Sequence, residues 1–152
     1  MIQRIQSVFL LIVTALLAIA SFKPFGYFLS QDNLSQVPFT PFGINIGEGQ
    51  VEHTWGLLAL LVLGTIISFA TIFLFKNRML QIRMCIFNIL VLVGYYCSMI
   101  VFLFYSLAEG MIDRFHISWA ISLPVVSIIL LILAIRGIGA DEALVKATNR
   151  LR

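Results

Sequence analysis

Charged side chains are scarce in this sequence: they make up 11% of its 152 residues, whereas an average soluble domain has about 25%. The hydrophobic residues, 61% of the chain, gather in long runs that would cover a water-exposed surface. This pattern excludes a soluble domain and predicts a single membrane domain over residues 1–152, with the lipid bilayer as its surroundings. The basic residues stand singly rather than in a stripe, so the net charge of +3 does not predict nucleic acid as a partner.

Residues with the chemistry of a catalytic or redox site are also few, since the chain has two cysteines and two histidines. Cys85 and Cys97 lie in one apolar run, about 120° apart around a helix and about 18 Å apart along it, so they cannot bond to each other there. No nucleotide-binding loop, zinc motif, Ser-His-Asp arrangement or carboxylate pair is readable. The sequence therefore predicts no catalytic residue, no cofactor and no metal site.

Four apolar runs are long enough, or nearly so, to cross about 30 Å of hydrocarbon as helices. They cover residues of about 5–22, 54–75, 82–107 and 117–135, and charged side chains are absent from their interiors. We therefore expect an all-α protein with four transmembrane helices in an antiparallel up-down bundle. The first run ends in Ala18-Ile19-Ala20, which resembles a signal-peptidase site, but its basic segment is short and its apolar stretch is long, so a retained helix is favoured.

The positions of Lys and Arg predict the orientation of this bundle. Lys23 and Arg114 fall on one side of the predicted membrane. The other side holds Arg4, Lys76, Arg78, Arg83, Arg136, Lys146, Arg150 and Arg152. By the positive-inside rule the second side faces the cytoplasm, which places both termini there.

The connections differ in length and character. The turn at 76–81 is short, so the second and third helices should be adjacent and antiparallel. The outer loop at 23–53 is rich in Pro and Gly, which disfavour a helix. Phe42, Ile44 and Ile46 alternate as in a short strand, so this loop should form a small cap at the outer membrane surface.

The cytoplasmic tail at 136–152 begins with Gly137 and Gly139 and then has acids before bases, which predicts a separate short C-terminal helix. One interpretation is a helix lying in solvent or among lipid headgroups, and the other is a docking peptide for a partner. The candidate docking residues are Asp141, Glu142, Leu144, Val145, Arg150, Leu151 and Arg152.

Asn88 is the most polar side chain inside a predicted span, and such a group either joins helices or lines a pathway. Two small-xxx-small pairs, Gly64 with Ser68 and Gly94 with Ser98, would allow neighbouring helices to approach closely. His53 and His116 fall at the same outer interface. A metal, haem or quinol site there is conceivable, although interfacial histidines more often bind water.

Three segments together carry a family resemblance: residues 1–8, the inner turn at 75–78 with 81–83, and the tail at 141–142, 144–145 and 149–152. In these segments the chain resembles the four-helix bacterial membrane proteins of the domain of unknown function 4293. The resemblance implies a retained N-terminus and places all three segments at the cytoplasmic face. It implies no activity and no catalytic residue.

These observations leave three functions open. The first is a non-catalytic accessory subunit of an envelope membrane complex, which binds membrane protein partners. The second is a small homo-oligomeric transporter or channel lined by Asn88 and nearby hydroxyls. The third is a membrane redox or metal-binding protein that uses His53 and His116.

Overall fold

Four α-helices make up most of the computed structural model, which describes residues 2–29, 36–45, 51–52, 54–74, 77–108 and 114–150. The α-helices are α1 (Ile2–Phe22), α2 (Trp55–Phe73), α3 (Arg78–Ala108) and α4 (Ser122–Arg150), and a short 3₁₀ helix, η2 (Trp119–Ile121), precedes α4. The strands are β1 (Gly26–Leu29), β2 (Gln36–Phe39), β3 (Ile44–Asn45), β4 (Val51–Glu52) and β5 (Arg114–Ile117).

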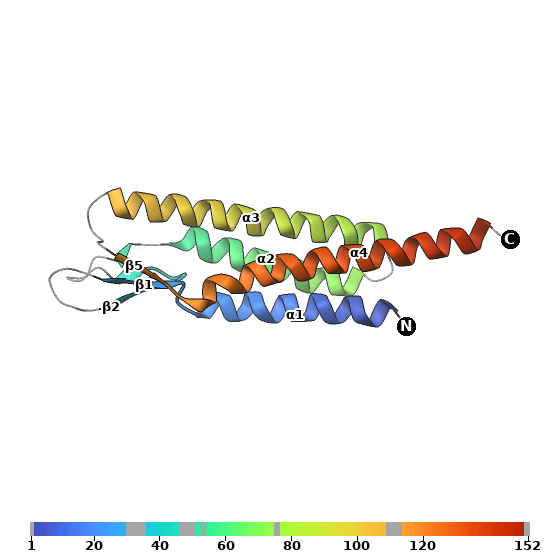
Figure 1. The fold of residues 1–152 in the computed structure, drawn as a ribbon, viewed down its shortest axis with the longest axis horizontal. Helices are drawn as coiled ribbons and strands as arrows, with labels where there is room; N and C mark the ends of the chain where they lie inside the picture. Colours follow the sequence, from blue (N-terminus) through green and yellow to red (C-terminus); the bar gives the residue numbers. More distant parts are fainter. Residues whose placement is uncertain are drawn as a thin grey trace.

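The helices form an elongated bundle in which successive helices run in opposite directions (Figure 1). Each of α1, α2 and α3 packs against the next helix, and α4 closes the ring against α1. Both termini and the turn between α2 and α3 lie at one end of the bundle, and the strands lie at the other (Figure 1). The predicted adjacency of the second and third helices is therefore confirmed.

The composition of the helices suits lipid on their outer faces. Among the described residues, three stretches are long and apolar enough to cross a membrane: Trp55–Phe73, Arg78–Tyr105 and Trp119–Ala140. The described part of α1 adds a shorter apolar stretch, Ser7–Phe22. Large apolar side chains are exposed along all four helices, which is what a helix in hydrocarbon shows and a helix in water does not.

The core of the bundle forms around α1. Leu10, Val13, Leu17 and Ala20 recur every three or four residues and are all fully buried, so they form one stripe that faces the other helices. This stripe packs against α2 on one side and α4 on the other. Removal of α1 would therefore leave both neighbours without their inner contact.

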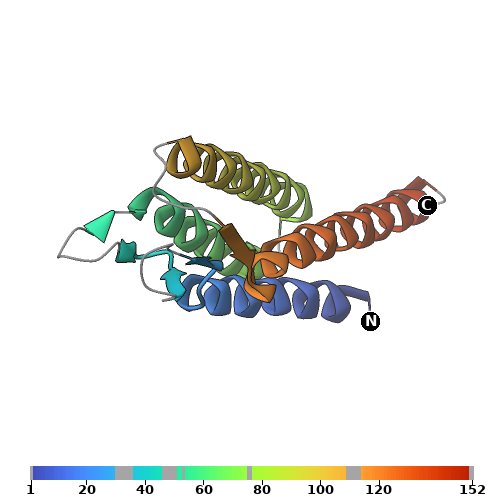
Figure 2. The same cartoon turned by 60° about the vertical axis from the view of Figure 1, so that its left-hand side comes forward.

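Helix α4 corrects the prediction of a separate short tail helix, because it runs without a break from Ser122 to Arg150. Gly137 and Gly139 do not end it. A glycine stops a helix when its backbone turns left-handed, and neither of these two glycines has a positive φ. Ile138, between them, is fully buried and keeps this turn packed on the bundle. The C-terminal part of α4 then extends past the other helices (Figure 2).

The prediction of an all-α fold with one strand near Phe42 is also incomplete, because the described segments at the end of the bundle away from the termini form two small sheets (Figure 1). One has the antiparallel order β2-β1-β5, with Gly26 opposite both Phe39 and Ile117. The other pairs β3 with β4. Strand β5 includes Ile117, which was expected to start the fourth helix. Two outer connections far apart in the sequence thus meet in one sheet, called here the cap sheet.

Aromatic side chains join the cap sheet to the helices. Phe25 and Phe39 are fully buried, with ring centroids 5.8 Å apart, and Phe25 also lies 5.7 Å from the ring of Tyr95 on α3. The backbone N–H of Phe25 donates to the carbonyl of Phe39 at 2.8 Å, and the N–H of Ser118 donates to the carbonyl of Phe25 at 2.9 Å. These contacts close the outer end of the bundle with a packed aromatic cluster.

Candidate functional site: a buried amide and an open groove on helix α3

The first feature is a buried amide between α2 and α3. The side chain of Asn88 is 1% exposed, and its Nδ2 donates a hydrogen bond to Oγ of Ser68 at 2.6 Å. Ser68 is also fully buried. In an apolar interior a polar side chain is stabilised by a partner on another helix, so this bond ties α3 to α2. Of the two interpretations of Asn88, the position favours helix joining over the lining of a pathway.

Gly64 allows this amide to fit. A Cβ atom added at Gly64 would lie 3.1 Å from Oδ1 of Asn88 and 3.6 Å from side-chain atoms of Leu17 and Leu92. Oδ1 has no hydrogen-bond partner among the described atoms and faces the space left by the missing side chain of Gly64. The pair Gly64 and Ser68 thus has the role predicted from its spacing, since one residue gives space to the amide and the other binds it.

Gln81 is a further polar contact between the same helices, which the sequence had placed in the turn. The structure begins α3 at Arg78, so Gln81 lies within the helix and is buried. Its Nε2 donates to the carbonyl oxygen of Thr71 at 3.4 Å. The signal that could have found it is the spacing of seven residues between Gln81 and Asn88, which puts both on one face of a helix.

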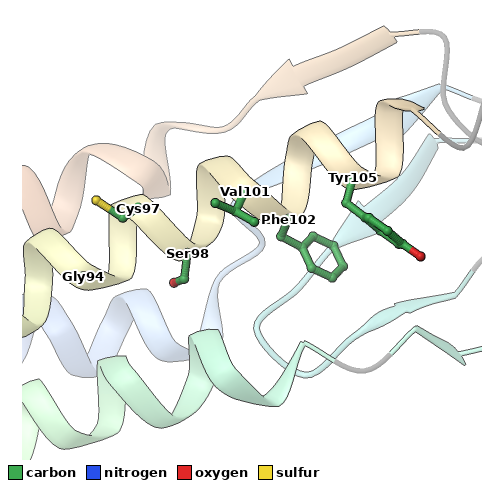
Figure 3. A pocket seen from close by; sticks show the side chains of 6 residues that line it. All are labelled: Gly94, Cys97, Ser98, Val101, Phe102 and Tyr105. Carbon is green, nitrogen blue, oxygen red and sulfur yellow. The ribbon is translucent and has the colours of Figure 1, made fainter.

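The second feature is an open groove on another face of α3. A Cβ atom added at Gly94 would meet nothing within 4 Å, so this glycine, unlike Gly64, does not make room for a side chain of the described chain. The groove has a volume of about 600 Å³. We call it the α3 groove, and its lining residues are Gly94, Cys97, Ser98, Val101, Phe102 and Tyr105 (Figure 3).

The lining of the α3 groove is almost entirely apolar. Ser98 is its small polar member, and the Ser98 hydroxyl donates to the carbonyl of Tyr95 on its own helix at 2.9 Å. All six lining residues come from α3, so the groove follows that helix along its outer half (Figure 3). An apolar surface of this kind fits an apolar rod, either a helix or a lipid chain.

The outer end of the α3 groove is held by the cap sheet. The ring of Phe102 stacks on that of Phe39 from β2, with centroids 5.6 Å apart and an angle of 12° between the planes. Phe39 is fully buried, so one wall of the groove rests on the aromatic cluster. The groove is therefore a formed feature of the fold rather than the product of one mobile side chain.

The remaining predicted residues do not gather into a site in the described part of the chain. His116 lies in β5 opposite Tyr27 and is exposed, whereas His53 lies outside the described residues. Cys85 is buried and Cys97 exposed, and both are free thiols. Searching the described residues finds no group of three or more His, Cys, Asp and Glu side chains that could hold a metal ion.

The predicted docking residues lie at the far end of α4. Asp141, Glu142, Leu144 and Arg150 are part of the continuous helix, and Val145 is exposed on it. Leu151 and Arg152 lie outside the described residues. A docking role for this segment stays a prediction.

The fold and the groove together define a class: a mostly helical protein with lipid-compatible helices, a small outer sheet and an apolar groove. Residues 2–151 match the model of the family described as domain of unknown function (DUF4293). The chain belongs to that family, as its resemblance in three segments predicted. A comparison with curated proteins finds no match.

Proposed function

We propose that this chain is an integral protein of a bacterial inner membrane, with four spans and both termini in the cytoplasm. Arg78 and Arg83 lie in the first turns of α3, at the end of the bundle that holds both termini, whereas Lys23 directly follows α1 and Arg114 begins β5 at the opposite end. This sidedness supports the orientation by the positive-inside rule. The packing of α1 between α2 and α4 supports a first helix that is retained rather than cleaved.

Thiol labelling tests this orientation. Asn77→Cys and His116→Cys, each in a chain without its native cysteines, place one thiol at each end of the bundle, and both positions are exposed. In intact spheroplasts a membrane-impermeant maleimide should label position 116 and should reach position 77 only after permeabilisation. Labelling of position 77 in intact spheroplasts would show that the bundle has the opposite orientation.

Within this membrane framework, we propose that the protein is a non-catalytic subunit that binds another membrane protein laterally, within the bilayer. The observation that carries this proposal is the α3 groove, an apolar depression on the lipid side of a spanning helix. Gly94 lines this groove, and the space beside it is not filled by any described part of the chain. Asn88 supports the same role, because its amide is occupied in joining α2 to α3.

Photo-crosslinking within the membrane tests the lateral binding site. A benzophenone amino acid replaces Val101, which is 68% exposed and lines the α3 groove, and in a control chain it replaces Ile100, which is exposed about 100° further around the helix. Irradiation of whole cells should give a defined protein adduct from position 101 and none, or a far weaker one, from position 100. If both positions gave lipid adducts and no protein adduct, the proposal of a lateral protein partner would be wrong.

A further inference from the structure

Exposed aromatic and apolar side chains gather where the helices meet the cap sheet. They come from four different elements, namely the last residue of α1, the first of α2, the last of β5 and the first of η2. We call this set the outer belt, and its members are Phe22, Trp55, Ile117 and Trp119, each between 64% and 77% exposed. Both tryptophans of the chain are among them. Tryptophan is enriched where the hydrocarbon of a membrane meets the headgroups, because its ring is apolar and its N–H is polar.

Helix α3 measures the depth of this level, because it rises by about 1.5 Å per residue from Arg78 at the inner end of the bundle. Tyr95 lies about 26 Å from Arg78 along the helix, and Phe102 about 36 Å. The hydrocarbon of a bilayer is about 30 Å thick, and each headgroup layer adds about 5–8 Å. With the charged Arg78 at the inner boundary of the hydrocarbon, Tyr95 lies just inside the outer boundary and Phe102 lies among the outer headgroups.

Aromatic contacts place the cap sheet at the same depth. The ring of Phe25, directly before β1, lies 5.7 Å from the ring of Tyr95. The ring of Phe39 in β2 lies 5.6 Å from the ring of Phe102. The end of the cap sheet that touches the helices therefore reaches from the outer boundary of the hydrocarbon into the headgroup layer.

The outer belt has the same depth by two separate measures. Ile117 precedes Ser118, whose backbone N–H donates to the carbonyl of Phe25 at 2.9 Å. On another helix, Trp55 lies about 27 Å from Phe73 at the inner end of α2. Both measures place the outer belt close to the outer boundary of the hydrocarbon, which is the depth that tryptophan favours.

We infer that the outer phospholipid headgroup layer surrounds the cap sheet, so that the sheet stands within the membrane interface and not in the water above it. The inference rests on the proposed function, since it takes the membrane spans as given, and it adds the part of the outer face that contacts lipid headgroups. A tilt of the bundle keeps the cap sheet in the interface, because it shortens every distance along the membrane normal and so brings the sheet deeper.

The exposed side chains at the outer end of α3 support this depth. The apolar stretch of α3 continues to Tyr105, past the depth at which α2 begins. Val101 and Phe104 lie next to Phe102 in the sequence and are 68% and 69% exposed. A membrane that ended at the depth of Trp55 would leave both in water, where exposed apolar surface is unfavourable. An interface that includes the cap sheet also covers these two side chains.

The far end of the cap sheet reaches the water. Strand β1 leads away from the helices from Gly26 to Leu29, a length of about 10 Å (Figure 1). Leu29 is opposite the polar positions Gln36 and Arg114. The sheet thus passes through the headgroup layer from an apolar end to a polar end.

The native chain provides the first test, because Trp55 and Trp119 are its only tryptophans. The protein is reconstituted into vesicles of phosphatidylcholine that carries bromine either near the headgroup or near the end of the acyl chain, since bromine quenches tryptophan on contact. The bromine near the headgroup should quench the fluorescence several-fold more strongly. Stronger quenching by the deep bromine would contradict the depth of the outer belt and overturn the inference.

Single tryptophans then measure the depth of the cap itself. In a chain without its native tryptophans, Ile117→Trp and Phe42→Trp replace exposed side chains of the cap. Phe42 lies near the start of α2, because the Thr54 hydroxyl donates to the carbonyl of Pro41 at 3.0 Å. Both variants should be quenched by brominated lipid, and more strongly by the bromine near the headgroup.

Two control variants set the ends of the depth scale. Leu90→Trp replaces an exposed side chain about 18 Å from Arg78, near the middle of the hydrocarbon, and should be quenched most by the deep bromine. Val145→Trp, exposed on the part of α4 beyond the other helices, should be quenched by aqueous iodide and by neither lipid. Circular dichroism of each variant shows that its helices are intact.

The outcomes separate this inference from the proposed function. If Ile117→Trp and Phe42→Trp responded to iodide as Val145→Trp does, and to neither brominated lipid, the cap sheet would stand in water and the inference would be wrong. Deep quenching of Leu90→Trp in the same experiment would keep the membrane spans. If Leu90→Trp also escaped both brominated lipids, the membrane spans themselves would be rejected.

Discussion

The pairs Gly64–Ser68 and Gly94–Ser98 have the same spacing on neighbouring helices, yet their surroundings are opposite. At Gly64 the missing side chain leaves room for Oδ1 of Asn88, and Ser68 accepts a hydrogen bond from the same amide. At Gly94 the space is empty, and Ser98 bonds to its own helix. A small-xxx-small pair therefore marks a place where another helix could approach closely. Only the structure around the pair shows whether a helix of the same chain does so.

The same contrast separates the two faces of α3. Its inner face carries Asn88 and Tyr95, which contact α2 and the aromatic cluster. Its exposed face carries apolar side chains such as Leu90, Val93 and Val101, which no described part of the chain covers. In lipid the hydrophobic effect does not draw exposed apolar side chains into the bundle, so close packing and hydrogen bonds distinguish the inner face.

The largest expected effect concerns the aromatic cluster that supports one wall of the α3 groove. Phe39→Ala should lower the free energy of unfolding by about 3–5 kcal/mol, because it removes a fully buried ring and leaves a cavity between Phe25 and Phe102. Thermal exposure of the buried Cys85 thiol to a maleimide dye, in a Cys97→Ser background, measures this. Phe42→Ala is the matched control, since Phe42 is largely exposed and its loss should have little effect.

Overpacking at Gly64 should come next. Gly64→Leu forces side-chain atoms into the space of Asn88 and should destabilise the bundle by about 1–3 kcal/mol in the same thiol assay. Gly56→Leu adds the same side chain on the same helix, where a Cβ meets nothing within 4 Å. Equal melting temperatures for the two variants would show that the contact between α2 and α3 does not depend on Gly64.

The helices could be predicted from the sequence because each apolar run is long enough, or nearly so, to cross a bilayer, whatever it packs against. The continuity of α4 could not, because Gly137 and Gly139 look like a stop unless the burial of Ile138 between them is known. The cap sheet was missed for a different reason. It pairs Gly26 with Ile117, and one sequence holds no signal for a pairing between such distant segments.

For the candidate site, the depth of Asn88 in its run singled it out as a polar group that either joins helices or lines a pathway, while its partner Ser68 was only one of several hydroxyls in the spans. The α3 groove could not be predicted at all. A helix in lipid is apolar on every side, so its periodicity does not tell an inward face from an outward one.

A smaller effect is expected at Gly94, where the missing side chain leaves open space. Gly94→Ala should stabilise the isolated chain by about 0.5–1 kcal/mol, because alanine is the better helix former and its methyl group meets open space. The measurement is the melting temperature in dilute detergent, where copies are separated. A lower melting temperature would mean that Gly94 serves a contact within its own chain.

The smallest effect is the coupling between Asn88 and Ser68. A double-mutant cycle of Asn88→Ala and Ser68→Ala should give an interaction free energy of about 0.6 kcal/mol, and not more than about 1.7 kcal/mol, because hydrogen bonds between membrane helices also find partners in the unfolded chain. The matched cycle of Asn88→Ala with Ser98→Ala should be additive, since the Ser98 hydroxyl bonds within its own helix. If both cycles were additive, the closeness of α2 and α3 would come from Gly64 and apolar packing alone. A coupling found only with Ser68 would show that the Asn88 amide helps to hold α2 and α3 together. An amide used in this way is not available to bind a solute, and the exposed face of α3 is then the better candidate for binding.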